Sequence, residues 1–200
     1  MATLTEHKTL LMRANRTLGS ALMELNLVKI QDMEQANEKL LEMVAQNQLR
    51  QSSILAILAF DLKVLREEDL LQHVVEVDGV GLVDLRDYDV PDESRKNLDM
   101  GACWATWSVP FDKEEEFFFV ATAYYLSPAV RAFWEKQLGG AILWFGTTLE
   151  GVADYLERLQ SERTASLNPF AAVTQAPFVP GVVAPISTGT PRIFAPASKP

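Results

Sequence analysis

Apolar residues recur at every third or fourth position through the first 77 residues, the spacing of one face of an α-helix. Two stretches, LGSALMELNLV at 18–28 and LAILAFDLKVL at 55–65, start 37 positions apart and carry similar residues at matching positions. The offset indicates a repeated unit or the general likeness of amphipathic helices. Each stretch predicts a helical hairpin that turns near Asn26 or Lys63, and two such hairpins would form a small bundle.

The pattern changes after residue 77, where short runs of strand-forming residues alternate with helical stretches. Ser127 and Pro128 predict a helix start, and Gly139 predicts its end. Strands are predicted at 80–85, 103–111, 117–125 and 141–146, and helices at 90–98, 127–140 and 147–160. A charged turn at 112–116 predicts a hairpin between the second and third strands. This order predicts a small sheet with helices packed on it.

These patterns predict an α+β fold with three parts: a tandem helical-hairpin lobe at 1–77, a small sandwich-like α/β lobe at 78–162, and a disordered tail at 163–200. Seven of the ten prolines lie in the tail, which has neither helical nor strand periodicity. The tail also contains Phe170, Phe178 and Phe194. It is either a solvated tail or a short linear motif that docks on a partner.

Composition and charge argue against several kinds of partner and location. The net charge of −9 opposes binding to nucleic acid and to an anionic membrane surface. No run approaches the ~20 apolar residues of a membrane span, so direct membrane insertion is not expected. The N-terminus lacks a secretory signal pattern, which predicts a cytoplasmic protein. The lone Cys103 forms no internal disulfide and fits a reducing compartment.

The residues form no recognisable catalytic constellation, so the protein is not expected to be an enzyme. GGAILWFGTT lacks the lysine of a phosphate loop, and VDGVGLVD leads into a strand instead of a helix. Neither a metal site nor a nucleophilic pair is expected from His7, His73 and one cysteine. His7 lies in an N-terminal segment that is expected to be flexible. The carboxylates Glu67/Glu68 and Glu114–Glu116 are expected to be solvated.

Four tryptophans lie in the second lobe, and most are expected in its core. Trp104 and Trp107 are an odd number of positions apart in the strand predicted at 103–111. In a regular strand they would face opposite ways. One of them is therefore a candidate for an exposed binding surface.

The ordered set of motifs resembles the N-terminal domain of type II secretion and type IV pilus assembly ATPases. The resemblance covers about residues 14–160. It rests on the two hairpin stretches, REEDLL after the second of them, LVDL at 82–85, Pro110, Ala121, Pro128 and the closing TTLEGVADYLERL. The family places this domain ahead of a motor with a phosphate loop. The resemblance therefore implies the domain without its motor, with the Pro-rich tail in the motor's place.

The resemblance also implies candidate ligand residues. MshEN-type members of the family bind cyclic di-GMP through the paired hairpins. Their pattern has an Arg before Leu-Gly, a Gly at each turn and a Gln that closes each second helix. The candidates here are Arg16, displaced by one position from the place of the Arg, Leu18 and Gly19, with Arg50 as a substitute. Departures from the pattern stand at Thr17, Asn26, Leu40, Ile54, Ala56, Lys63 and Val77.

The leading hypothesis is a non-enzymatic adaptor in a bacterial cell. By resemblance, it docks to a protein of an envelope secretion or pilus-type machine, which would recruit it to the inner membrane. No cofactor or metal is expected under this hypothesis. The alternative is a cyclic di-GMP-responsive sensor with a degraded binding motif. A third possibility is a folded domain whose family role has been replaced.

Overall fold

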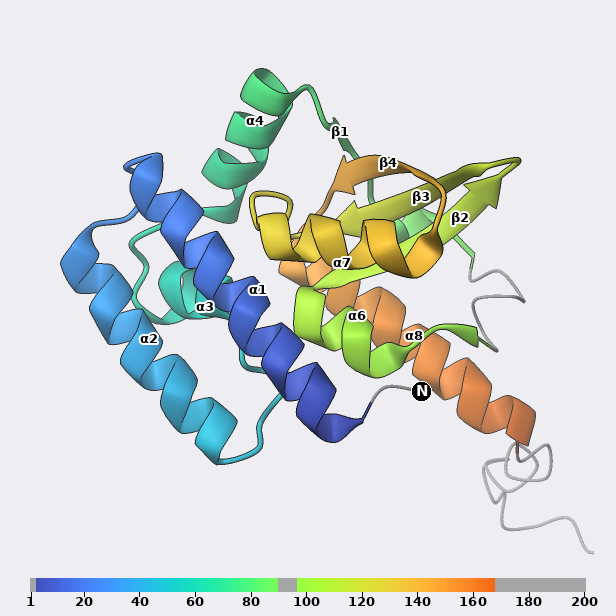
Figure 1. Cartoon of the computed structure of the whole chain (residues 1–200), viewed down its shortest axis with the longest axis horizontal. Helices are drawn as coiled ribbons and strands as arrows, with labels where there is room; N and C mark the ends of the chain where they lie inside the picture. Colours follow the sequence, from blue (N-terminus) through green and yellow to red (C-terminus); the bar gives the residue numbers. More distant parts are fainter. Residues whose placement is uncertain (1–2, 90–96, 168–200) are drawn as a thin grey trace, which may run out of the picture.

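The computed structural model describes residues 3–89 and 97–167 and has the α+β fold that the sequence predicts (Figure 1). Most of the helix predicted at 90–98 and the tail from residue 168 lie outside the described residues. The helices are α1 (Leu4–Glu24), α2 (Ile30–Ala45), α3 (Ile54–Ala56), the π-helix η1 (Ile57–Asp61), α4 (Glu67–Asp78), the 3-10 helix η2 (Leu85–Asp87), α6 (Met100–Thr106), α7 (Pro128–Leu138) and α8 (Leu149–Leu167). The strands are β1 (Gly81–Leu82), β2 (Ser108–Glu114), β3 (Phe117–Thr122) and β4 (Ala141–Gly146).

Two helix-turn-helix stretches follow one another in the first part of the chain; α1 packs against α2, whereas α4 packs against β1 and β4 of the sheet. Asn26 (φ 56°) and Lys63 (φ 54°), both named from the sequence as turn positions, adopt the left-handed conformation. The helices that follow begin at Ile30 and Glu67. The first arms differ, because α1 has 21 residues and its counterpart is the short α3 followed by η1. That the hairpins are copies of one unit stays a prediction.

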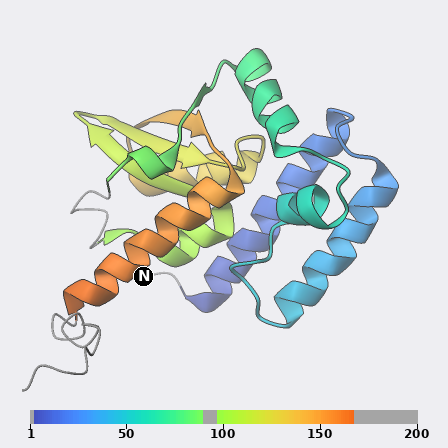
Figure 2. The same cartoon turned by 180° about the vertical axis from the view of Figure 1, so that it is seen from behind.

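A four-stranded sheet of order β1-β4-β3-β2 forms the second part. β4 runs parallel to β1 and to β3, while β2 and β3 form the predicted antiparallel hairpin. Helix α7 covers one face of the sheet and α8 crosses the other, as the two opposite views show (Figures 1 and 2). Gly139, at φ 66°, ends α7 as predicted.

The strand predicted at 103–111 is wrong in its first half, which belongs to helix α6. Asp99 starts this helix, because its side chain accepts a hydrogen bond from the Ala102 N–H. Trp107, at φ 47°, ends it in the left-handed conformation. Trp104 and Trp107 are 7% and 6% exposed, and their rings make an edge-to-face contact at 5.5 Å. Neither tryptophan is therefore the exposed one that was predicted.

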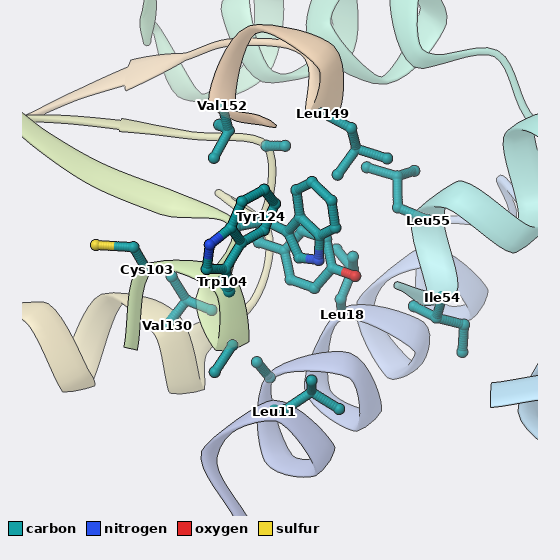
Figure 3. Packing of buried hydrophobic residues seen from close by; sticks show 14 of the residues in the cluster. Leu11, Leu18, Ile54, Leu55, Cys103, Trp104, Tyr124, Val130, Leu149 and Val152 are labelled. Carbon is teal, nitrogen blue, oxygen red and sulfur yellow. The ribbon is translucent and has the colours of Figure 1, made fainter. Parts of the chain in front are cut away.

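One hydrophobic core extends through both parts of the chain, since α1 packs against α6 and α7 as well as α2 (Figure 3). A buried polar network joins them: Asn15 Oδ1 accepts hydrogen bonds from the Ile54 N–H and the Tyr124 hydroxyl, each at 2.7 Å. Ser53 Oγ lies 2.8 Å from the same hydroxyl. The division into lobes at residues 77 and 78 stays a prediction.

Candidate functional site

Two of the four candidate ligand residues are part of the core. Leu18 is 0% exposed, and Gly19 is buried beside it on α1. A Cβ atom on Gly19 would lie 3.0 Å from Met33 Sδ and 3.5 Å from Ile54 Cδ1. The absence of a side chain at Gly19 thus lets α1 approach the other helices closely.

The two candidate arginines are exposed on different elements. Arg16 lies on α1, and Arg50 lies in the segment after α2. The Arg50 guanidinium carbon is 5.7 Å from the centre of the Trp104 ring, a cation–π distance. The hollow that Arg50 lines includes none of the other three candidates. The structure therefore does not gather the four residues around that hollow.

This hollow lies between the N-terminal half of α1, the segment after α2, and α6. Its volume is about 190 Å³. The lining residues are Leu4, His7, Leu11, Leu49, Arg50, Met100, Gly101, Trp104 and Ala105. Ligand pockets for small molecules have volumes of roughly 300–1,000 Å³, so the Arg50 hollow suits a single side chain better than a whole ligand.

Two residues that line the Arg50 hollow carry polar groups with no hydrogen bond or ion pair among the described residues. Trp104 Nε1 is buried and, among residues 3–89 and 97–167, has no hydrogen-bond partner. In the same part of the chain, no carboxylate forms an ion pair with Arg50. The hollow therefore combines an apolar lining with an exposed cation that is available to a negative group.

His7 forms the wall that separates this hollow from a larger one. His7 lies in a helix that begins with the Thr3–Glu6 capping box. The prediction that its N-terminal segment is flexible is therefore wrong. His7 Nε2 is 2.9 Å and 3.0 Å from the two carboxylate oxygens of Asp99. Partial burial raises the pKa of Asp99, but hydrogen bonds from His7 and the Ala102 N–H outweigh it and leave that pKa lowered.

The larger groove, on the other side of His7, has a volume of about 880 Å³. It shares His7, Met100 and Gly101 with the Arg50 hollow. A Cβ on Gly101 would overlap the His7 imidazole, so the absence of a side chain at Gly101 lets α6 approach this ring closely. The other lining residues are Thr5, Glu6, Thr9, Leu10, Arg13, Asn97, Leu98, Asp99, Ala102, Phe133, Gln137 and Arg163.

The expectation of solvated carboxylates is confirmed for Glu68, which is exposed, and is wrong for Glu67. Its side chain is partly buried, and Oε1 accepts a hydrogen bond of 2.9 Å from the Leu149 N–H at the start of α8. Burial raises the pKa of Glu67, with the hydrogen bond from Leu149 acting in the opposite direction. This carboxylate therefore links α4 to α8, and its perturbed pKa has a structural cause.

The described residues were searched for a reactive thiol, a metal-binding group of side chains and a membrane-spanning helix. The Cys103 thiol is fully buried, and burial raises its pKa, which disfavours the nucleophilic thiolate. Within 3–89 and 97–167, no three side chains of His, Cys, Asp or Glu are grouped to hold a metal ion. In the same ranges, no helix is both long enough and apolar enough to cross a membrane.

Sequence reasoning missed this site because it assigned Trp104 to a strand. The pattern Asp99-Met-Gly-Ala-Cys-Trp contains a helix-capping residue before a short apolar run, which could have identified α6. The position of Arg50 over Trp104 had no local signal, since the two residues lie on separate elements.

No family model matches the chain, and no curated protein matches it. Among solved structures, the N-terminal domain of XpsE is 21% identical with a TM-score of 0.47, over 70% of this chain and 91% of that chain. The structure of MshE with cdg is 17% identical with a TM-score of 0.45, over 71% of this chain and 97% of that chain.

Proposed function

We propose that this protein is a non-enzymatic interaction module that docks through the Arg50 hollow onto a protein of an envelope secretion or pilus-type machine. The observation that carries the proposal is the exposed Arg50 guanidinium over the buried Trp104 ring, at the mouth of an apolar hollow. Arginine and tryptophan are enriched among the residues that dominate the binding energy of protein interfaces. A hollow of about 190 Å³ fits one anchoring side chain of a partner.

The same site defines the chemistry of that partner. The lining by Leu4, Leu11, Leu49 and Met100 favours an aliphatic or aromatic anchor. Arg50 has no ion-pair partner within the described residues, so a carboxylate beside the anchor would complete the site. The partner surface is therefore an apolar side chain next to an acidic group.

The proposal is tested by binding of the full chain to the purified cytoplasmic domain of the inner-membrane platform protein from the same cell. We expect Arg50→Glu to weaken binding at least tenfold, because it places a like charge against the partner's acid. Arg16→Glu is the matched control, since Arg16 is exposed but lies outside the hollow. Equal affinities for the wild type and both variants would overturn the proposal.

The cyclic di-GMP alternative makes a different prediction. Saturable heat on calorimetric titration with cyclic di-GMP, lost in Arg16→Ala, would favour the sensor. Leu18 and Gly19 are buried, so they could contact a nucleotide only if the core opened. We therefore expect no saturable heat.

A further inference from the structure

The two edges of the sheet differ in how they are protected. Along β2, Pro110 has no N–H, the register shifts between Pro110 and Asp112, and charged residues follow at 112–114. A proline, a bulge and charges each block the addition of a further strand. Along β4, the segment Ala141–Trp144 contains neither a proline nor a charge. The fold therefore protects one edge and leaves part of the other open.

The open part of β4 is the length that β1 does not reach. β1 pairs only with Phe145 and Gly146. The Val83 N–H donates to the Gly146 carbonyl, so the backbone of Gly146 points towards the β1 side. Backbone groups alternate along a strand, and those of Ile142 therefore point to the same side, beyond the end of β1. Among the described residues, no strand pairs with Ile142 on that side.

Apolar side chains flank this open edge. Leu143 on β4 and Phe117 on β3 are 44% and 45% exposed. Phe119 pairs with Leu143, and Phe117 pairs with Ala141, so both exposed side chains lie on one face near the start of β4. An added strand with alternating apolar residues would cover them.

The surrounding charges favour a basic occupant over a second copy of the chain. The exposed residues Glu114, Glu115 and Glu116 precede Phe117 and lie at the end of the edge where Ala141 is. Glu76 and Asp78 are exposed at the end of α4, just before β1. If the β4 edges of two copies paired in antiparallel orientation, Glu114–Glu116 of one copy would approach Glu76 and Asp78 of the other. Like charges oppose that pairing.

We propose that residues Arg192–Ala195 (RIFA), in the tail of the same chain, add as a strand to β4 at Ala141–Trp144. The open edge and this segment have the same length, and Pro191 and Pro196 bound the segment on both sides. Prolines at these positions would end the pairing where the open edge ends. Residues 168–200 carry Arg192 and Lys199 and no acid, which complements the acidic surroundings of the edge.

The intervening chain is long enough for this contact. The described chain ends with α8 at Leu167, and residues 168–191 separate it from the segment. At ~3.3 Å per extended residue they can span about 80 Å. A compact body of this size has a radius of gyration of only ~15 Å, so every point on its surface is within reach. This proposal is independent of the Arg50 hollow.

Amide hydrogen exchange in the full chain, read by NMR, tests the proposal at the Ile142 N–H. We expect this amide to exchange at least about tenfold faster in Ile193→Pro, because proline removes an N–H and breaks the added strand. The matched control is Val182→Pro, which changes the same tail outside the segment and should leave the exchange unchanged. Neither variant alters the described body, so both should fold.

Two results would overturn the proposal. One is equal exchange of Ile142 in the wild type and Ile193→Pro. The other is protection that rises with protein concentration together with a doubled mass in light scattering, which would assign the edge to a second copy. Protection lost in Ile193→Pro, with the mass of a monomer, supports the contact within one chain.

Discussion

Asn15 and Tyr124, both fully buried, are joined by a 2.7 Å hydrogen bond from the tyrosine hydroxyl to the asparagine Oδ1. Asn15 lies in the middle of α1, and Tyr124 follows β3. The same oxygen accepts the Ile54 N–H, and Asn15 Nδ2 donates to the Leu11 carbonyl at 2.9 Å. One side chain therefore connects the helical hairpins with the sheet.

We expect Asn15→Ala to lower the free energy of unfolding by about 2–4 kcal/mol, because it leaves the buried Ile54 N–H without its acceptor. Tyr124→Phe should cost less, about 1–2 kcal/mol, since Asn15 Oδ1 keeps the bond from Ile54. Urea unfolding of the two variants measures both values. A loss below ~0.5 kcal/mol for Asn15→Ala would show that the network contributes little.

Leu18→Ala should lower the free energy of unfolding by about 2–5 kcal/mol, because it removes a fully buried side chain from the core. Its exposed neighbour Arg16 provides the control, and Arg16→Ala should stay within about 0.5 kcal/mol of the wild type. Chemical denaturation without any ligand checks both. Unchanged stability in Leu18→Ala would contradict the core position of this residue.

Lys63→Gly should raise the free energy of unfolding by about 0.5–1 kcal/mol, because Lys63 holds a left-handed conformation that disfavours a side chain. Asn26 has the same conformation at the other hairpin, but asparagine tolerates it better. Asn26→Gly should therefore gain less, under about 0.5 kcal/mol. Thermal melts of the two variants, run side by side, give the comparison, and a larger gain at Asn26 would refute it.

Glu67→Gln should change the dependence of stability on pH. Since burial raises the pKa of Glu67, the folded state holds the proton more strongly than the unfolded chain does. Stability is therefore lost as the pH rises from the unfolded value, about 4.3, through the raised folded value. Glutamine keeps an oxygen that can accept the Leu149 N–H and has no charge to desolvate.

Calorimetric melting temperatures at a series of pH values measure this effect. We expect the advantage of Glu67→Gln over the wild type to be absent below pH ~4 and to grow to a fraction of a kcal/mol near neutral pH. Glu68→Gln is the control, because Glu68 is exposed at the adjacent position. An advantage that does not vary with pH would show that ionisation of Glu67 has no part in it.

Local sequence signals were sufficient where an element is specified by its own residues. Pro128 and Gly139 mark the two ends of α7, and the continuous apolar run at 117–121 forms most of β3. The turn positions Asn26 and Lys63 were also identified from the sequence, because each follows a helical stretch. These signals depend on interactions among residues a few positions apart.

Tertiary packing determined the local structure of residues that are compatible with more than one conformation. Residues 103–106 were assigned to a strand because Trp104 and Thr106 favour strands, yet they form part of helix α6, and all four are buried. Ser127 was predicted to cap α7, but its hydroxyl donates to the Ala14 carbonyl at 3.0 Å instead. Burial against a distant element thus outweighed the local preference.

The sequence by itself determined the α+β class, the order of most helices and strands, and the resemblance that directs attention to a protein partner. Only the tertiary structure decided that Leu18 and Gly19 are core residues, that Glu67 caps α8, and that Arg50 lies over Trp104. The physical reason is distance along the chain. Asn15 and Tyr124 are 109 positions apart, and no local pattern encodes a contact between residues so far from each other.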